Sequence, residues 1–129
     1  MTIYDLTIVM TESELKERFK SFSIRVVKMV DCLPNTISGR AIGSQIVRSG
    51  TSPAANYRAA CLAKSEKDFL NKLKMVEEEL DETEYWMEVI AETEILPQSR
   101  IESLRNECVE LLKIIVSSIV STRKHLNEK

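Results

Sequence analysis

One stripe of side chains constrains the fold of this chain more than any other feature of its sequence. The stripe alternates spacings of four and three residues through Phe69, Leu73, Val76, Leu80, Thr83, Met87 and Ile90. Residues three and four apart share one face of an α-helix, so the pattern predicts an amphipathic helix over about 66–93. Ser65 and Asp68 are predicted to supply its N-cap and an acidic first turn.

The segment at about 13–33 shows the same alternation of spacings. Its apolar positions are Leu15, Phe19, Phe22, Val26, Met29 and Leu33. Thr11 followed by Glu14 fits a capping box at the start of a helix. Pro34 disfavours helical geometry at the residue before it, so this second helix is predicted to end at Leu33.

The segment at about 38–63 is a third predicted helix, and its second half contains Ala54, Ala55, Ala59, Ala60 and Ala63. Such small side chains let a neighbouring helix approach closely. Pro53 removes a backbone donor, so we expect a kink or a break near residues 50–53. A buried Asn56 would need hydrogen-bond partners, and we expect it to bond to a neighbouring helix or loop. The alternative is an Asn56 that faces solvent.

The last predicted helix, at about 97–126, carries two apolar stripes, and Pro97 suits its first position. One stripe runs through Ile101, Leu104, Cys108, Leu111 and Ile115, and the other through Val109, Leu112, Val116, Ile119 and Val120. Links of about three to six residues favour antiparallel neighbours. The sequence therefore predicts one all-α domain over residues 1–129, an antiparallel up-down-up-down four-helix bundle.

A four-helix bundle needs one apolar stripe per helix for its own core, and this chain has more. The second stripe of the last helix is surplus, and Tyr85 and Trp86 widen the stripe at 66–93. Large exposed apolar patches usually mark interfaces. We therefore expect a homo-oligomer, with the candidate interface residues Tyr85, Trp86, Val109, Leu112, Val116 and Ile119.

Charge is split between the two halves of the chain. Residues 1–76 contain 12 Lys and Arg against 7 Asp and Glu, whereas residues 77–129 contain 6 against 13. Head-to-tail assembly can place the basic part of one subunit against the acidic helix of the next. Alternatively, the basic half can bind nucleic-acid phosphates. The candidate residues for that role are Arg40, Arg48, Arg58, Lys64, Lys67, Lys72 and Lys74. Their alternative role is in salt bridges within or between subunits, which we favour for Arg48 and Arg58.

The sequence offers few residues for catalysis, and we predict no catalytic residue, metal ligand or cofactor. The one histidine, His125, has no Glu three residues before it, so the Glu-x-x-His motif of di-iron bundles is missing. The glycines at 39 and 43 lack the lysine and the strand of a phosphate-binding loop. The acidic run at 77–84 is interpreted as a solvated outer face or as a surface that pairs with another subunit's basic half.

Three cysteines, Cys32, Cys61 and Cys108, are far apart in the sequence and form no CxxC pair. The N-terminal residues contain no export signal, and no apolar run is long enough to span a bilayer. We therefore expect a cytoplasmic protein with reduced thiols and no membrane partner.

The densest local patterns are Arg-Ser-Gly-Thr-Ser at 48–52, Ala-Asn-Tyr-Arg at 55–58, Lys-Asp-Phe at 67–69 and Glu-Thr-Glu-Tyr-Trp at 82–86. In this order they resemble the bacterial four helix bundle protein family, typified by the protein encoded in 23S rRNA intervening sequences. The chain also resembles the accessory variability proteins of diversity-generating retroelements. The similarity spans roughly residues 19–112, with departures at Pro53, Ala54 and Ala59.

The resemblance implies a left-handed bundle that forms a pentameric ring and has no established enzymatic activity. It also implies nucleic acid, or a nucleic-acid enzyme such as a reverse transcriptase, as a partner. We predict a non-catalytic oligomeric scaffold or protein-interaction module. The alternative function is that of an RNA- or DNA-binding accessory protein of the ribosomal intervening-sequence or retroelement type.

Overall fold

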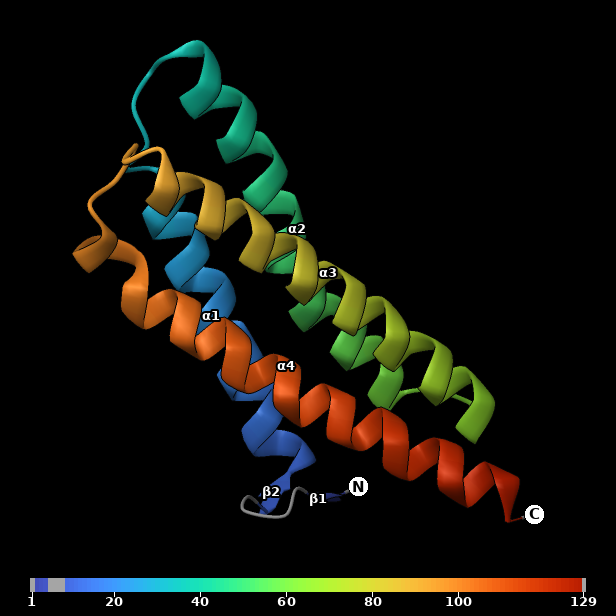
Figure 1. Cartoon of the computed structure of the whole chain (residues 1–129). Coiled ribbons are helices and arrows are strands. Elements are labelled where there is room, and N and C mark those ends of the chain that lie inside the picture. The colour runs from blue at the N-terminus through green and yellow to red at the C-terminus, as the bar shows by residue number, and fades with distance from the viewer. Residues whose placement is uncertain (1, 5–8, 129) are drawn as a thin grey trace.

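The chain folds into four long helices preceded by a short β-hairpin. This computed structural model describes residues 2–4 and 9–128, with side chains from residue 10 onward. The helices are α1 (Glu12–Val30), α2 (Ile37–Cys61), α3 (Glu66–Glu92) and α4 (Gln98–Asn127). The antiparallel hairpin pairs β1 (Thr2–Tyr4) with β2 (Val9–Thr11). Consecutive helices run in opposite directions (Figure 1), which confirms the predicted all-α up-down-up-down four-helix bundle.

The predicted helix boundaries lie within three residues of the observed ones, because the caps were recognisable. Thr11 accepts a hydrogen bond from the backbone N–H of Glu14 at 3.1 Å, and Ser65 accepts one from Asp68 at 3.0 Å. Thr36 caps α2 in the same way, although the sequence analysis did not identify it. The hairpin was also not predicted, since strands of three residues give no sustained alternation.

Two end positions were wrong. α1 ends at Val30 rather than Leu33, because Leu33 N–H bonds to the Val30 carbonyl at 3.0 Å and tightens the chain into a turn. Pro97 lies just before the first residue of α4, as its N-cap.

Of the kink or break expected near Pro53, the break does not occur, because helix α2 continues through this residue. Proline removes one hydrogen bond from a helix interior, at a cost of about 3 kcal/mol. Buried side chains on both sides of this point, among them Ile46 and Tyr57, hold the helix against its neighbours. Tertiary packing of an apolar face supplies most helical stability in a folded protein, and here it outweighs the lost bond.

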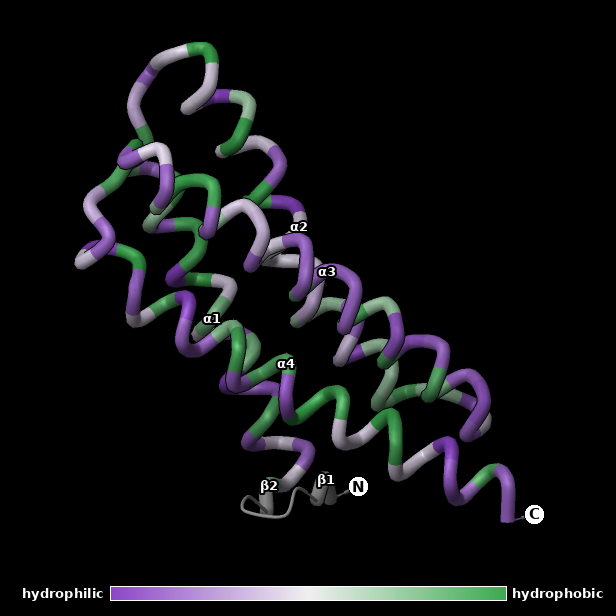
Figure 2. Tube along the Cα trace, viewed as in Figure 1, coloured by the Kyte–Doolittle hydropathy of each residue, from purple (hydrophilic) through white to green (hydrophobic). Residues whose placement is uncertain are grey.

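The predicted stripe of α3 is the centre of the core. All seven of its members are buried, and Leu73, Val76, Leu80 and Met87 are completely so. Phe19 of α1 stacks on Tyr57 of α2 with ring centroids 5.2 Å apart. Figure 2 shows the same organisation as hydrophobic residues that recur along every helix between hydrophilic ones.

The helices form two layers. Each helix packs on the next in the chain, and α4 returns to contact α1. In Figure 1, α3 and α4 lie in front of α1 and α2. The α1–α2 pair and the α3–α4 pair therefore present their outer faces on opposite sides of the bundle.

Candidate functional site

The two densest sequence patterns meet across the seam between α2 and α3. Arg48 pairs with Glu79 at 3.0 Å and also with Glu82. One residue later in each pattern, the Thr83 hydroxyl donates to Ser49 Oγ at 2.9 Å. These residues therefore join two helices of one subunit. Arg48 already pairs with carboxylates of its own subunit, so it is not free to bind an external ligand.

Gly50 brings α1 against the same part of α2. A Cβ atom at this position would lie 2.6 Å from Cγ1 of Val26, closer than real atoms approach. Only glycine therefore permits this spacing between the two helices without a shift of the buried valine. Thr51 follows and donates to the Val47 carbonyl of its own helix at 2.7 Å.

The seven basic candidate residues do not gather on one surface. Arg40 lies at the start of α2, where it donates to Asn35 at 2.8 Å, and Lys64 lies beyond its other end. Their 24-residue separation corresponds to about 36 Å along a helix axis. Lys67 and Lys74 are exposed on α3, and Lys72 is half-buried there. Of the seven, Arg58 lines a groove with other basic side chains.

That groove lies between α1 and α2 and has a volume of about 570 Å³. The basic side chains that line it are Lys16, Lys20 and Arg58, and one carboxylate, Glu17, lies among them. Its apolar lining includes Ile24, Ala54 and Ala55. The sequence analysis did not select Lys16, Lys20 or Ile24, although their spacing of four residues places them on one side of α1.

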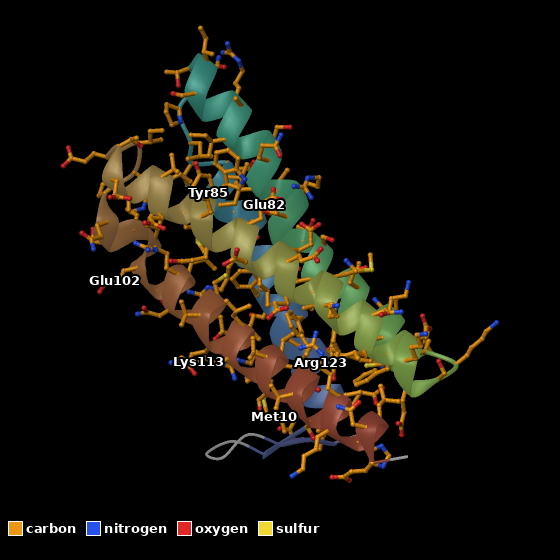
Figure 3. All side chains as sticks on the ribbon, turned by 45° about the vertical axis from the view of Figure 1, so that its right-hand side comes forward. Met10, Glu82, Tyr85, Glu102, Lys113 and Arg123 are labelled. Carbon is orange, nitrogen blue, oxygen red and sulfur yellow. The ribbon has the colours of Figure 1, made fainter. Side chains whose placement is uncertain are left out.

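The opposite outer face carries most of the predicted interface residues. Val109 and Val116 are exposed on α4 together with Val120, which is 60% exposed, and Leu112 beside them is half-buried. Ile119 was wrongly assigned to this face. It is only 3% exposed, because it continues the inner stripe of Cys108, Leu111 and Ile115. Glu102 and Lys113 project away from the bundle on α4 (Figure 3).

The α3 side of this face is acidic. Helix α3 contains ten Asp and Glu against three Lys, whereas α2 contains three Arg and neither Asp nor Glu. Asp81 and Glu88 are exposed, and Tyr85 between them is 56% exposed. Trp86 is half-buried and donates to Glu82 at 3.3 Å, on the α2 side of the helix. Tyr85 and Glu82 lie on one stretch of α3 (Figure 3).

Part of the acidic run is neutralised inside the subunit, and the expected salt bridges of Arg48 contribute to this. Glu79 and Glu82 pair with Arg48, and Glu84 pairs with Arg105 of α4 at 2.8 Å. Glu84 Oε2 and Arg105 Nε are buried without a hydrogen-bond partner. The hydrogen bond between the two side chains, from Arg105 Nη2 to Glu84 Oε1, therefore leaves both of these atoms unsatisfied.

Asn56 is half-buried, and its amide donates to Ser52 Oγ at 2.9 Å. Both residues belong to α2, so the predicted bond to a neighbouring helix or loop is wrong. Residues four apart on a helix are adjacent, and Ser52 supplies the nearest acceptor. The bond from Asn56 to Ser52 therefore spans Pro53 within α2.

Among the remaining titratable groups are the histidine and the thiols, and the Cys61 thiol lies beside Glu12 and Tyr57. His125 is exposed near the end of α4, with Nδ1 2.9 Å from Glu66 Oε1. Burial raises the pKa of Cys61 to about 11 and that of Cys108 to about 12, so both remain thiols at neutral pH. Within residues 2–4 and 9–128, no group of three His, Cys, Asp or Glu could hold a metal ion. No helix in this part of the chain has the length and apolar character needed to cross a membrane.

Comparisons with known proteins place this arrangement in a family. The profile of the 23S rRNA-intervening sequence protein family matches residues 11–117, from the cap of α1 through most of α4. A solved structure from Bacteroides thetaiotaomicron, described as a protein of unknown function from the S23 ribosomal protein family, is 38% identical to this chain. It has a TM-score of 0.77 and covers 81% of this chain and 97% of its own. No curated protein matches. The chain therefore belongs to the 23S rRNA-intervening sequence protein family.

Proposed function

We propose that this chain is a non-enzymatic protein that assembles with copies of itself and serves as a helical scaffold or protein-interaction module. The observation that carries the proposal is the exposed row Val109, Val116 and Val120 on α4. The core of the bundle does not use these side chains, since the inner stripe of α4 is separate from them. Covering apolar surface contributes roughly 25 cal/mol per Å², so a second copy gains stability by packing there.

The non-enzymatic part of the proposal is supported by the state of the nucleophilic and basic groups. A reactive cysteine needs a lowered pKa, whereas the pKa values of Cys61 and Cys108 are raised. The single histidine, His125, pairs with a carboxylate at the end of the bundle. It lies far along α4 from Arg105 and Glu107, which form ion pairs with the neighbouring helices. The solved relative is itself described as a protein of unknown function.

The proposed assembly is a ring, because opposite faces of one subunit differ in character. Contacts between unlike faces continue from copy to copy and close when the rotation permits. Five subunits are proposed on the strength of the resemblance alone. The proposal includes a cytoplasmic location, which the free thiols Cys32, Cys61 and Cys108 support, since disulfides are rare there.

A second candidate function is nucleic-acid binding, favoured by the basic side chains Lys16, Lys20 and Arg58 that line one groove. Phosphate binding releases counterions, so the affinity for RNA should fall steeply as salt rises. This candidate is less well supported, because Arg48 is occupied by the α2–α3 seam and the other basic candidates are dispersed.

The test of self-assembly uses sedimentation velocity on the wild type and on the Val116→Lys/Val120→Lys variant. The wild type should sediment as a multiple of the 14.7 kDa chain, and the variant should sediment as a smaller species. Ser99→Lys/Ser121→Lys is the control, since both serines are exposed on α4 and the variant adds the same two charges outside the valine row. A wild type of 14.7 kDa would overturn the proposal.

A further inference from the structure

We propose that the α1–α2 groove of one copy receives the acidic α3–α4 face of a second copy. This inference rests on the proposed self-assembly and identifies the two surfaces that meet. The groove presents Lys16, Lys20 and Arg58, with the one carboxylate of Glu17 among them, around an apolar lining. The opposite face presents exposed carboxylates of α3 beside Tyr85 and the valine row of α4.

The charges on both surfaces are largely uncompensated within the subunit. Lys16 pairs with Glu12 at 3.3 Å, whereas Lys20 and Arg58 make no ion pair with another described residue. The same holds, among residues 10–128, for Asp81 and Glu88 on the other face. Contact between the two surfaces would therefore pair charges that the single subunit leaves in solvent.

One interval between a charged and an apolar side chain is the same on both surfaces. Along α1, Lys16, Lys20 and Ile24 follow one another at intervals of about 6 Å, so two cations precede one apolar group. Along α3, Asp81 precedes Tyr85 by the same interval, and Glu88 follows by about 4.5 Å. A helix of this kind can place Tyr85 near Ile24 while Asp81 reaches Lys20, and the exposed Glu88 adds negative charge to the same face.

The apolar part of the groove selects a protein rather than a nucleic acid as the occupant. Ile24 is 47% exposed, and Val27, one turn further along α1, is exposed as well. A phosphate backbone would pair with the cations and would leave these side chains in water. A second copy covers them with Tyr85 and with the valine row.

The layer arrangement makes the contact head-to-tail. Because α1–α2 and α3–α4 face opposite sides, each copy that uses one face keeps the other free for the next copy. A two-fold dimer would instead bring groove against groove and cations against cations, which like-charge repulsion disfavours.

Charge reversal tests the assignment, with the mass of the assembly as the readout. Lys20→Glu/Arg58→Glu reverses the groove, and Asp81→Lys/Glu88→Lys reverses the face. Each variant alone should associate about 100-fold more weakly than the wild type, because both put like charges across the contact. The fourfold variant carries all of these changes. Its charges are again complementary, so it should recover the wild-type mass.

A mixture of the two double variants gives an independent check. Each groove then meets an oppositely charged face only on the other variant, so assemblies should form again with strictly alternating copies. Closed alternating assemblies contain an even number of chains. Lys28→Glu/Arg100→Glu is the matched control, because these two cations line a different groove, between α1 and α4, and should leave the mass unchanged.

The outcomes separate this inference from the proposed function. A monomeric wild type would overturn both. A wild type that assembles, together with double variants that assemble equally well, would overturn the choice of surfaces and leave self-assembly standing. If Lys20→Glu/Arg58→Glu kept its mass but lost salt-sensitive RNA binding, the groove would be a nucleic-acid surface and the inference would be wrong. Circular dichroism should show equal helicity in all variants.

Discussion

Thr83 in α3 donates a hydrogen bond to Ser49 in α2 at 2.9 Å, and both side chains are fully buried. The Thr83 hydroxyl also lies 2.8 Å from the Glu79 carbonyl, so one proton is shared between two acceptors. A polar pair in an apolar seam is satisfied only when the helices are in one register. This pair, with Arg48 and its carboxylates beside it, therefore fixes α2 against α3.

Replacing Thr83 by valine should destabilise the protein by about 1–3 kcal/mol, because Ser49 would lose its partner inside the seam. Ser49→Ala should cost less, since Thr83 keeps the Glu79 carbonyl as an acceptor. The double variant should cost less than the sum of the two single changes. Urea denaturation measures all three, and strict additivity would show that the pair does not interact.

Gly50→Ala should destabilise the protein by about 1–3 kcal/mol through overpacking against Val26. The direction is informative, because alanine is the better helix former by about 1 kcal/mol and would otherwise stabilise α2. Val26→Ala in the same chain should relieve the clash, so Gly50→Ala should be harmless in that background. Thermal unfolding of the wild type, the two single variants and the double variant measures this. A Gly50→Ala variant more stable than the wild type would contradict the close contact with Val26.

Leu80→Ala should destabilise the protein by about 2–5 kcal/mol, because Leu80 is completely buried in the central stripe of α3. Lys74→Ala is the control on the same helix, and its exposed side chain should change stability by less than about 0.5 kcal/mol. Guanidinium denaturation distinguishes the two. A loss below about 1 kcal/mol for Leu80→Ala would mean that the stripe does not face the core.

The thiols should titrate according to burial. Burial raises the pKa of Cys108 from 9.0 to about 12, and the Cys108 thiol contacts the Leu80 carbonyl at 3.3 Å. As pH rises, the Cys108 thiol of the unfolded chain loses its proton before the thiol of the folded chain does. The stability that the buried thiol contributes is therefore complete below about pH 9 and is lost as pH rises toward 12. The Cys108→Ala variant should lose less stability than the wild type over that pH interval. Equal slopes of stability against pH for the two proteins would contradict the raised pKa of Cys108.

Thiol modification provides a second measurement of the same burial. At neutral pH an aromatic disulfide reagent should modify the exposed Cys32 first and the half-buried Cys61 more slowly. Cys108 should react only when the chain unfolds. Early reaction of Cys108 in the folded protein would show that the seam between α3 and α4 opens locally.

The fold could be predicted from the sequence because its information is local and periodic. Leu73, Val76 and Leu80 repeat at helical spacing, and Thr11 and Ser65 mark helix starts. A break at Pro53 was one of two expected outcomes, and whether a helix continues through an internal proline depends on packing that no local pattern contains. Ile119 was misassigned for a related reason. The sequence of α4 contains two apolar stripes, and spacing alone does not determine which of them faces the core.

The candidate surface was less predictable, because it combines residues distant in sequence. Arg48 was selected for its charge, and only the bundle shows that Glu79 and Glu82 neutralise it. Lys20 and Arg58 line one groove across two helices, a proximity that the spacing within either helix does not reveal. The valine row was predictable, since Val109 and Val116 stand outside the inner stripe of their own helix.

The central claim is that this subunit assembles through unlike faces, and the mass of the unmodified chain in solution tests it most directly. Multi-angle light scattering should be measured over a hundredfold dilution series that includes micromolar concentrations. The account predicts a single mass of more than two 14.7 kDa chains that persists on dilution. A mass of one chain throughout would contradict self-assembly, and a mass of two chains would contradict the head-to-tail ring.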